Sequence, residues 1–154
     1  MRNFFIILST IAVLFTGCGG NSSDSSENSI YDGMDSREKT RMQQYFRLGK
    51  SLYMTHCSNC HQPDGSGLGA LYPPLAKSDY LMKDPVKTVC IIKNGLEGEI
   101  TVNGTVYNQP MPAHDNLTNI EIAEIITFIS NSWGNKSGLH EVKTIEKAAE
   151  DCSL

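Results

Sequence analysis

The stretch Cys57-Ser58-Asn59-Cys60-His61 decides how this sequence is interpreted. Two thiols three positions apart at the start of a helix can add across the two vinyl groups of one haem, and the adjacent imidazole then projects onto the iron. A redox-active CxxC site needs a βαβ context and a zinc site needs a second pair of ligands, and the sequence offers neither. The motif therefore predicts covalent haem attachment at Cys57 and Cys60, with His61 as an iron ligand.

The second iron ligand must come from a side chain some distance from His61. Met111 is the strongest candidate because Pro110 and Pro112 narrow the backbone freedom of its loop. A loop that is stiff before binding loses less entropy when a weak thioether ligand meets the iron. His114 is the alternative ligand and would give a lower potential, while a Met111 that only fills core space is the other alternative. The remaining candidates are Met54, Met82, His56 and His140.

A long helix is expected immediately before the motif. Asp35 or Ser36 can cap a helix that runs to His56, and apolar residues recur along it every three or four positions. Gly49 lies on this apolar stripe. Because glycine inside a helix costs about 1 kcal/mol relative to alanine, it usually marks a close helix crossing.

Two further helices are expected after the motif. One has Asp84 as its cap, Pro85 as its first residue and Gly95 just past its end. The last begins at the capping box Thr118-x-x-Glu121, carries an apolar stripe as far as Trp133 and stops at Gly134.

A hairpin is expected between these two helices. Two β-prone runs within residues 99–107 surround Asn103-Gly104, a strong short-range hairpin signal. Residues 64–69 contain three glycines and are expected to form a loop close to the haem edge. The predicted fold class is therefore all-α with one minor β-hairpin.

Several motifs together resemble the class I cytochromes c, in particular the small bacterial monohaem cytochromes. The resemblance covers residues 41–135 and implies a cytochrome c fold, one covalently attached haem c, and crossing N- and C-terminal helices in which Ile125 and Phe128 meet Gly49 and Tyr53. The matching segments are Gly49 to Tyr53, Cys57 to His61, Tyr72-Pro73-Pro74-Leu75-Ala76, Gly98 to Gly104, Tyr107-Asn108, Met111-Pro112 and Asn131 to Asn135.

The same resemblance implies residues around the haem. A proline carbonyl in the loop after the motif should accept a hydrogen bond from the far nitrogen of His61, which points to Pro73 or Pro74. Tyr72 and Tyr107 are expected either to line the haem or bind a propionate, or simply to pack in the core.

The N-terminus has the pattern of an export signal. Residues 1–17 contain an apolar run too short to span a bilayer, and the run ends at Cys18 in a way that is similar to a bacterial lipoprotein signal. Cys18 would then carry a lipid, and residues 18–35, rich in serine, would form a flexible tether. An ordinary signal peptide with a chance cysteine is the alternative. Either reading predicts an extracytoplasmic location, and lipidation would anchor the protein to a bacterial membrane on the periplasmic side.

The remaining chain divides into a haem domain, residues 36–135, and a C-terminal tail, residues 136–154, in which residues 139–151 can form a short amphipathic helix. Cys90 and Cys152 are left after the lipid and haem cysteines are assigned. Export places them in a disulfide-permissive compartment, so they either form a bridge or Cys90 remains a buried free thiol.

The expected function follows from the occupied coordination positions of the iron and from the balance of charged residues in the chain. With His61 and Met111 on the iron, no coordination position is open for a substrate, so an electron carrier is expected and an enzyme is not. Lys and Arg number 13 against 17 Asp and Glu, which leaves no basic surplus for nucleic acid. The expected partners are a respiratory oxidase, a reductase or a quinol-oxidising complex. The alternatives are a dedicated electron-entry subunit of one such complex, or a haem peroxidase or sensor from which Met111 dissociates.

Overall fold

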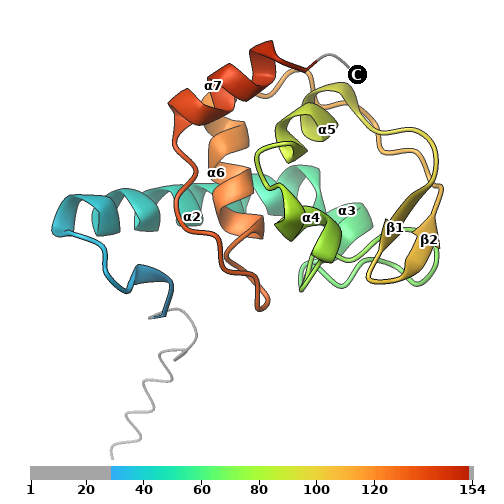
Figure 1. Ribbon diagram of the computed structural model, residues 1–154, viewed down its shortest axis with the longest axis horizontal. Coiled ribbons are helices and arrows are strands. Elements are labelled where there is room, and N and C mark those ends of the chain that lie inside the picture. Colours follow the sequence, from blue (N-terminus) through green and yellow to red (C-terminus); the bar gives the residue numbers. More distant parts are fainter. Residues whose placement is uncertain (1–28, 153–154) are drawn as a thin grey trace, which may run out of the picture.

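The structure, a computed structural model, describes residues 29–152 as a helical domain with one small antiparallel sheet (Figure 1). The predicted signal peptide and Cys18 lie outside the described residues. The mainly helical class with one hairpin is confirmed. None of the helices formed by residues 29–152 has both the length and the apolar character needed to span a bilayer. In chain order the elements are η1 (Ser29–Tyr31), α2 (Ser36–His56), α3 (Ser58–His61), α4 (Asp79–Lys83), α5 (Thr88–Asn94), β1 (Ile100–Val102), β2 (Thr105–Tyr107), α6 (Asn119–Ile129) and α7 (Val142–Glu150).

The start of α2 agrees with the sequence analysis. The Asp35 carboxylate accepts hydrogen bonds from the backbone N–H groups of Arg37 and Glu38, and the Glu38 carboxylate accepts one from the Asp35 N–H. This capping box satisfies backbone donors that the helix itself cannot pair. Within the expected tether, residues 18–35, the described part contains η1, a short 3-10 helix in which Ile30 is buried.

Helices α2 and α6 cross at Gly49. A Cβ placed on Gly49 would lie 1.9 Å from the Glu124 carbonyl oxygen and 2.9 Å from the Phe128 Cβ, so only a glycine fits between the two backbones. Phe128 also meets Tyr53, with ring centroids 5.4 Å apart. The expected contacts of Gly49 and Tyr53 with Phe128 are therefore present, while the closest neighbour of Gly49 is the Glu124 backbone.

The helix expected from Pro85 begins later in the structure. Asp84 accepts a hydrogen bond from the Lys87 N–H at 3.0 Å, but it closes a turn, and α5 starts only at Thr88. A separate short helix, α4, precedes this turn and is capped by Ser78, whose hydroxyl accepts from the Leu81 N–H. The expected helix is therefore present and ends before Gly95 as predicted, but it starts three residues later, because residues 85–87 form a turn with i→i+3 bonds and an aspartate can cap a turn as readily as a helix.

The last part of α6 also differs from the prediction. The helix ends at Ile129 and not at Trp133, which has a positive φ of 55°. Three consecutive polar side chains explain the early stop, because Ser130, Asn131 and Ser132 each donate a hydrogen bond to the carbonyl four residues earlier. Those side-chain bonds compete with continuation of the backbone ladder.

Strands β1 and β2 pair antiparallel around the turn Asn103-Gly104, as the sequence predicts. Both turn residues have positive φ, at 50° and 79°, which is the geometry of a tight two-residue hairpin loop. Asn103 and Asp79 exchange hydrogen bonds, side chain to backbone in each direction, at 2.7 and 3.0 Å. The hairpin is therefore fixed to the start of α4.

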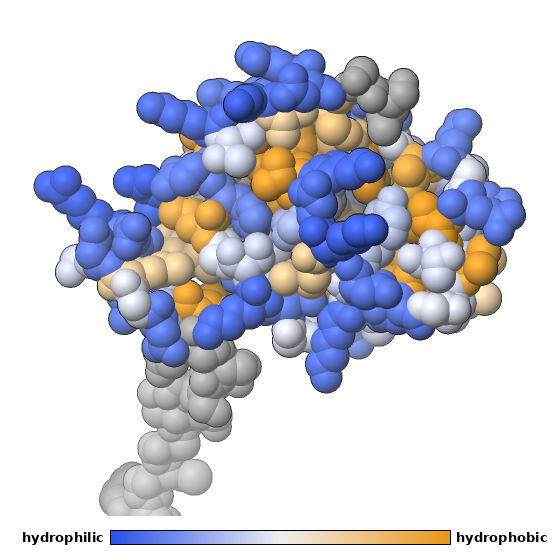
Figure 2. Space-filling model, viewed as in Figure 1, coloured by the Kyte–Doolittle hydropathy of each residue, from blue (hydrophilic) through white to orange (hydrophobic). Residues whose placement is uncertain are grey.

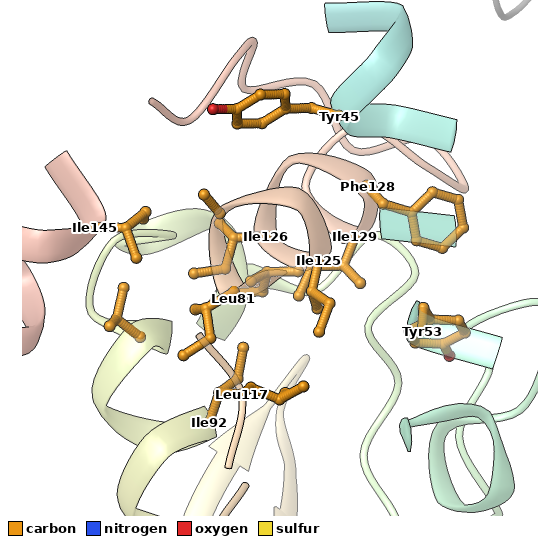
Figure 3. Packing of buried hydrophobic residues seen from close by; sticks show 13 residues of the cluster. Tyr45, Tyr53, Leu81, Ile92, Leu117, Ile125, Ile126, Phe128, Ile129 and Ile145 are labelled. Atoms are coloured by element: carbon orange, nitrogen blue, oxygen red, sulfur yellow. The ribbon is translucent and has the colours of Figure 1, made fainter. Parts of the chain in front are cut away.

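The hydrophobic core lies between α2, α5, α6 and α7 (Figure 3). Isoleucines of α6 fill its centre, and Ile145 reaches it from α7 with no exposed surface. On the α2 side an aromatic cluster forms, in which Trp133 packs against both Tyr53 and Phe128 with centroids 5.1 and 5.2 Å apart. These contacts place Tyr53 between the core and the segment that carries the cysteine motif.

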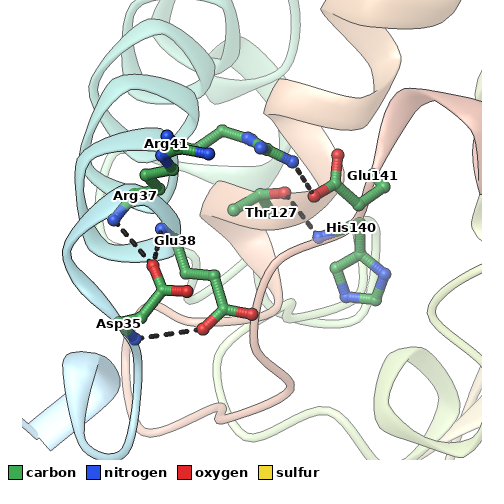
Figure 4. A network of polar contacts seen from close by, with 7 residues as sticks. All are labelled: Asp35, Arg37, Glu38, Arg41, Thr127, His140 and Glu141. Carbon is green, nitrogen blue, oxygen red and sulfur yellow. Dashed lines mark hydrogen bonds and ion pairs between the residues drawn. The ribbon is translucent and has the colours of Figure 1, made fainter.

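Helix α7 belongs to the same packed unit as the preceding helices. A disulfide joins Cys90 on α5 to Cys152, with Cα atoms 5.3 Å apart, so Cys90 is not a free thiol. At the other end of α7, Glu141 pairs with Arg41 of α2, and the His140 N–H donates to the Thr127 hydroxyl on α6 (Figure 4). The tail expected at residues 136–154 thus completes the core through Ile145.

Candidate functional site

An apolar cleft opens between α3, α5, the β1–β2 hairpin and the segment 109–112. A concave, mostly apolar lining with a few convergent polar groups is typical of cofactor sites. All eight residues assigned to the haem site by the sequence line it: Cys57, Cys60, His61, Tyr72, Pro73, Pro74, Tyr107 and Met111. The structure therefore brings together residues from segments far apart in the chain.

The His61 ring is held in one orientation. Its Nδ1 lies 3.0 Å from the Pro73 carbonyl oxygen, and because a carbonyl can only accept, Nδ1 donates the proton. This leaves Nε2 as the nitrogen free to bind a metal, in the tautomer that such a second hydrogen bond normally fixes. Burial lowers the pKa of His61, so the ring is neutral at pH 7 and keeps its lone pair. Of the two expected prolines, it is Pro73 that supplies the carbonyl.

Gly67 and Tyr53 hold the backbone around His61. A Cβ on Gly67 would lie 2.3 Å from the Tyr72 carbonyl oxygen and 2.8 Å from that of Pro73, and the Gly67 N–H donates to the His61 carbonyl. The Tyr53 hydroxyl donates to the Gln62 carbonyl at 2.5 Å. From the sequence, Tyr53 is expected only in the core, and the three glycines within residues 64–69 are the one local signal for the close approach at Gly67.

Met111 is fixed by backbone pairing. Its N–H and carbonyl form hydrogen bonds of 2.9 and 3.0 Å with Leu96, in an isolated antiparallel bridge. Gly95, expected only as a helix stop, has φ of 78°, and a Cβ there would lie 2.6 Å from the Met111 carbonyl oxygen. Gly95 therefore also allows the loop 109–112 to approach the end of α5. Nothing in the local sequence predicts the Leu96 partner.

The other candidate ligands lie outside the cleft. Within residues 29–152, Met111 is the one methionine that lines it. His114 instead packs edge-to-face against His56, with ring centroids 6.0 Å apart, and its pKa is lowered by burial and by His56. His140 is buried beside Ser137, Met54 is exposed on α2, and Met82 packs against the core.

The two cysteines of the motif reach the cleft as free thiols. Cys57 is the cap residue between α2 and α3, and Cys60 follows on α3. Neither forms a disulfide. Burial raises the pKa of the Cys57 thiol to about 12, with a further contribution from Cys60, so Cys57 is a neutral thiol at pH 7.

The residues present fit a covalently bound haem. The cleft is large and mostly apolar, its wall holds two thiols three positions apart, and one neutral imidazole and one thioether reach the same space. This donor set is that of a haem iron held by histidine and methionine. Tyr72 and Tyr107 line the cleft, and Tyr107 is almost fully buried.

Apolar side chains also reach the surface near this cleft. Figure 2 shows apolar patches among hydrophilic residues, extending to the end of the molecule where Figure 1 places β1 and β2. Val106 on β2 is exposed, as are Leu68 and Leu71 in the loop before Pro73.

Comparisons with known proteins agree with this site. Residues 46–133 match the family model described as Cytochrome c. Cytochrome c-552 of Thermus thermophilus is 33% identical over 91 residues, which are 56% of this chain and 69% of that protein. The gluconate 2-dehydrogenase cytochrome c subunit of Pantoea cypripedii is 36% identical over 94 residues, 58% of this chain and 21% of that subunit. The alcohol dehydrogenase (quinone) cytochrome c subunit of Gluconacetobacter polyoxogenes is 32% identical over 92 residues, 58% of this chain and 19% of that subunit. Because the matched stretch covers more than half of the chain and contains both the Cys57–His61 motif and Met111, this chain belongs to the cytochrome c family.

Proposed function

We propose that this protein is a membrane-tethered monohaem cytochrome c that carries single electrons between respiratory redox partners. The family implies an electron-transfer protein with a covalently attached haem c, typically one in a domain of this size. The proposed electron carrier is supported by one observation: Cys57, Cys60, His61 and Met111 line one apolar cleft. No catalytic side chain is part of the proposal.

The residues of the cleft suit rapid electron exchange. When bound, the haem supplies an Fe(II)/Fe(III) couple. Cys57 and Cys60 would hold the ring by thioether bonds, and His61 and Met111 would bind its iron. Pro73 orients His61 and Leu96 pairs with Met111, so neither side chain would need to move when the iron changes oxidation state. Little reorganisation is then required, and a thioether ligand raises the potential.

The proposed location follows from the N-terminus. Cys18, which lies outside the described residues, would carry the lipid and hold the domain at the periplasmic side of a bacterial membrane. Mass spectrometry of the mature N-terminus should find a lipid-modified Cys18, and Cys18→Ser should move the haem protein from the membrane to the soluble fraction. Unmodified soluble protein in the wild type would contradict the tether.

Methionine ligation is tested by the spectrum of the oxidised protein. Wild-type protein should show the weak sulfur-to-iron charge-transfer band and bind cyanide slowly. Met111→Ala should abolish the band and accelerate cyanide binding, whereas the exposed control Met54→Ala should behave as wild type. A high-spin resting iron in the wild type would instead favour a peroxidase or sensor in which Met111 dissociates.

A second candidate is a dedicated electron-entry subunit of one dehydrogenase, oxidase or reductase complex. Two of the similar proteins are cytochrome c subunits of dehydrogenases, although this chain spans only about a fifth of their length. Purification from membranes in mild detergent distinguishes the two proposals. A stoichiometric redox enzyme would favour the subunit, and a haem protein that purifies alone would favour the tethered carrier.

A further inference from the structure

We propose that helix α7 and the Cys90–Cys152 disulfide act as a brace that holds the Met111 loop in position through α5. The proposal rests on the proposed function in so far as Met111 is taken as the axial ligand. Cys90 and Cys152 are then positioning residues, because neither lines the cleft. Helix α7 lies outside residues 46–133, so the family match does not account for it.

Helix α5 depends on its neighbours for its position. It has only seven residues, and its N-cap residue, Lys87, makes no side-chain capping hydrogen bond. Helices this short are not stable by themselves in water. Val89 and Ile92 are buried in the core, and Ile91 and Ile92 line the cleft, so α5 is also part of the cofactor wall.

The end of α5 supports the segment that carries Met111. Leu96, two residues after α5, forms both hydrogen bonds of the bridge with Met111. The Ile92 carbonyl, within α5, accepts a third bond from the His114 N–H at 2.8 Å. The Met111 loop is therefore connected to α5 at Met111, through Leu96 just after the helix, and at His114, through Ile92 within it, so a displacement of α5 should move the thioether.

Helix α7 covers the side of α5 that faces away from the cleft. Ile145 reaches the core from α7 and is fully buried (Figure 3). The disulfide connects Cys90, within α5, to Cys152, two residues after the end of α7. The beginning of α7 is anchored independently by the Arg41–Glu141 pair and the bond from His140 to Thr127. The brace is thus fixed to α2 and α6 at one end and to α5 at the other.

The decisive experiment compares full-length haem protein with the double variant Cys90→Ser/Cys152→Ser. Three readouts are followed: the charge-transfer band, the rate of cyanide binding to the oxidised form, and hydrogen exchange of the Leu96, Met111 and His114 amides. Loss of the brace should accelerate cyanide binding and exchange at these amides by about tenfold or more, because local opening of α5 becomes easier. Asp35→Ala removes the cap of α2 far from α5, and this control should leave all three readouts unchanged.

The outcomes separate the brace from the ligand assignment. A double variant that unfolds more easily but keeps wild-type cyanide binding and amide exchange would overturn the brace. If the double variant does not fold, Ile145→Val retains the disulfide and should shift the same readouts in the same direction, and no shift would overturn it. A wild-type protein without the sulfur-to-iron band would instead refute Met111 as the ligand, while the amide exchange still decides whether α7 holds its loop.

Discussion

Replacing Gly49 by alanine would add one methyl group where α2 and α6 cross. The new Cβ would lie 1.9 Å from the Glu124 carbonyl oxygen and 2.5 Å from its carbon. Ordinary contact needs about 3.5 Å, so the helices would have to separate by more than about 1 Å. The obstacle is backbone on α6, which cannot rotate away as a side chain would, so we expect overpacking near the upper end of its usual range, about 3 kcal/mol. Alanine recovers about 1 kcal/mol of helix propensity. The expected net loss is about 2 kcal/mol.

Urea unfolding of the haem-loaded protein, followed by far-UV circular dichroism at pH 7, measures this loss. The unfolding midpoint of Gly49→Ala should fall while the slope of the transition stays constant. Ser51→Ala is the matched control, because Ser51 is exposed on the same helix and its replacement should change stability by less than about 0.5 kcal/mol. A Gly49→Ala variant as stable as the wild type would refute the close crossing.

Three further changes test other parts of the molecule. Replacing Cys90 and Cys152 together by serine removes a cross-link over 62 residues, and the chain-entropy relation predicts a loss of about 4 kcal/mol in the urea unfolding free energy. Burial lowers the pKa of His140 below its ordinary 6.5, so only the unfolded chain gains a proton as the pH falls through that value. Stability should therefore decrease below about pH 6.5, and urea midpoints for His140→Gln should show a smaller decrease, whereas an identical pH profile would contradict this assignment. Gly95→Ala should push the Met111 carbonyl away, because its Cβ would lie 2.6 Å from that oxygen, and a redox titration should find a lower midpoint potential.

The features that could be predicted from the sequence have local causes. The start of α2, the start of α6 and the hairpin turn each depend on side chains within three residues of one another, such as the Thr118–Glu121 capping box. The motif Cys57–His61 likewise carries its chemistry in five consecutive positions. Met111 could be selected because two prolines restrict its loop.

The features that could not be predicted depend on side-chain hydrogen bonds that compete with helix formation, or on contacts between segments far apart in the chain. Asp84 precedes a proline as a helix cap often does, yet its carboxylate closes a turn, and the helix capped by Ser78 had no comparable signal. The early end of α6 depends on three side chains that outcompete the backbone. The bridge between Leu96 and Met111 joins segments that only the folded chain brings together, so no pattern within either segment reveals it.

The aromatic cluster beside the cleft has an optical consequence. Trp133 is the single tryptophan of the chain, and its ring packs 5.1 Å from Tyr53, which itself lines the cleft. A haem bound in that cleft would be separated from this indole by one side chain and would accept its excitation energy, so the folded, haem-loaded protein should show almost no tryptophan fluorescence. Emission then appears when the haem is missing or when α2 and α6 separate. Tryptophan emission thus reports haem loading while the protein matures and its unfolding afterwards, without any added label.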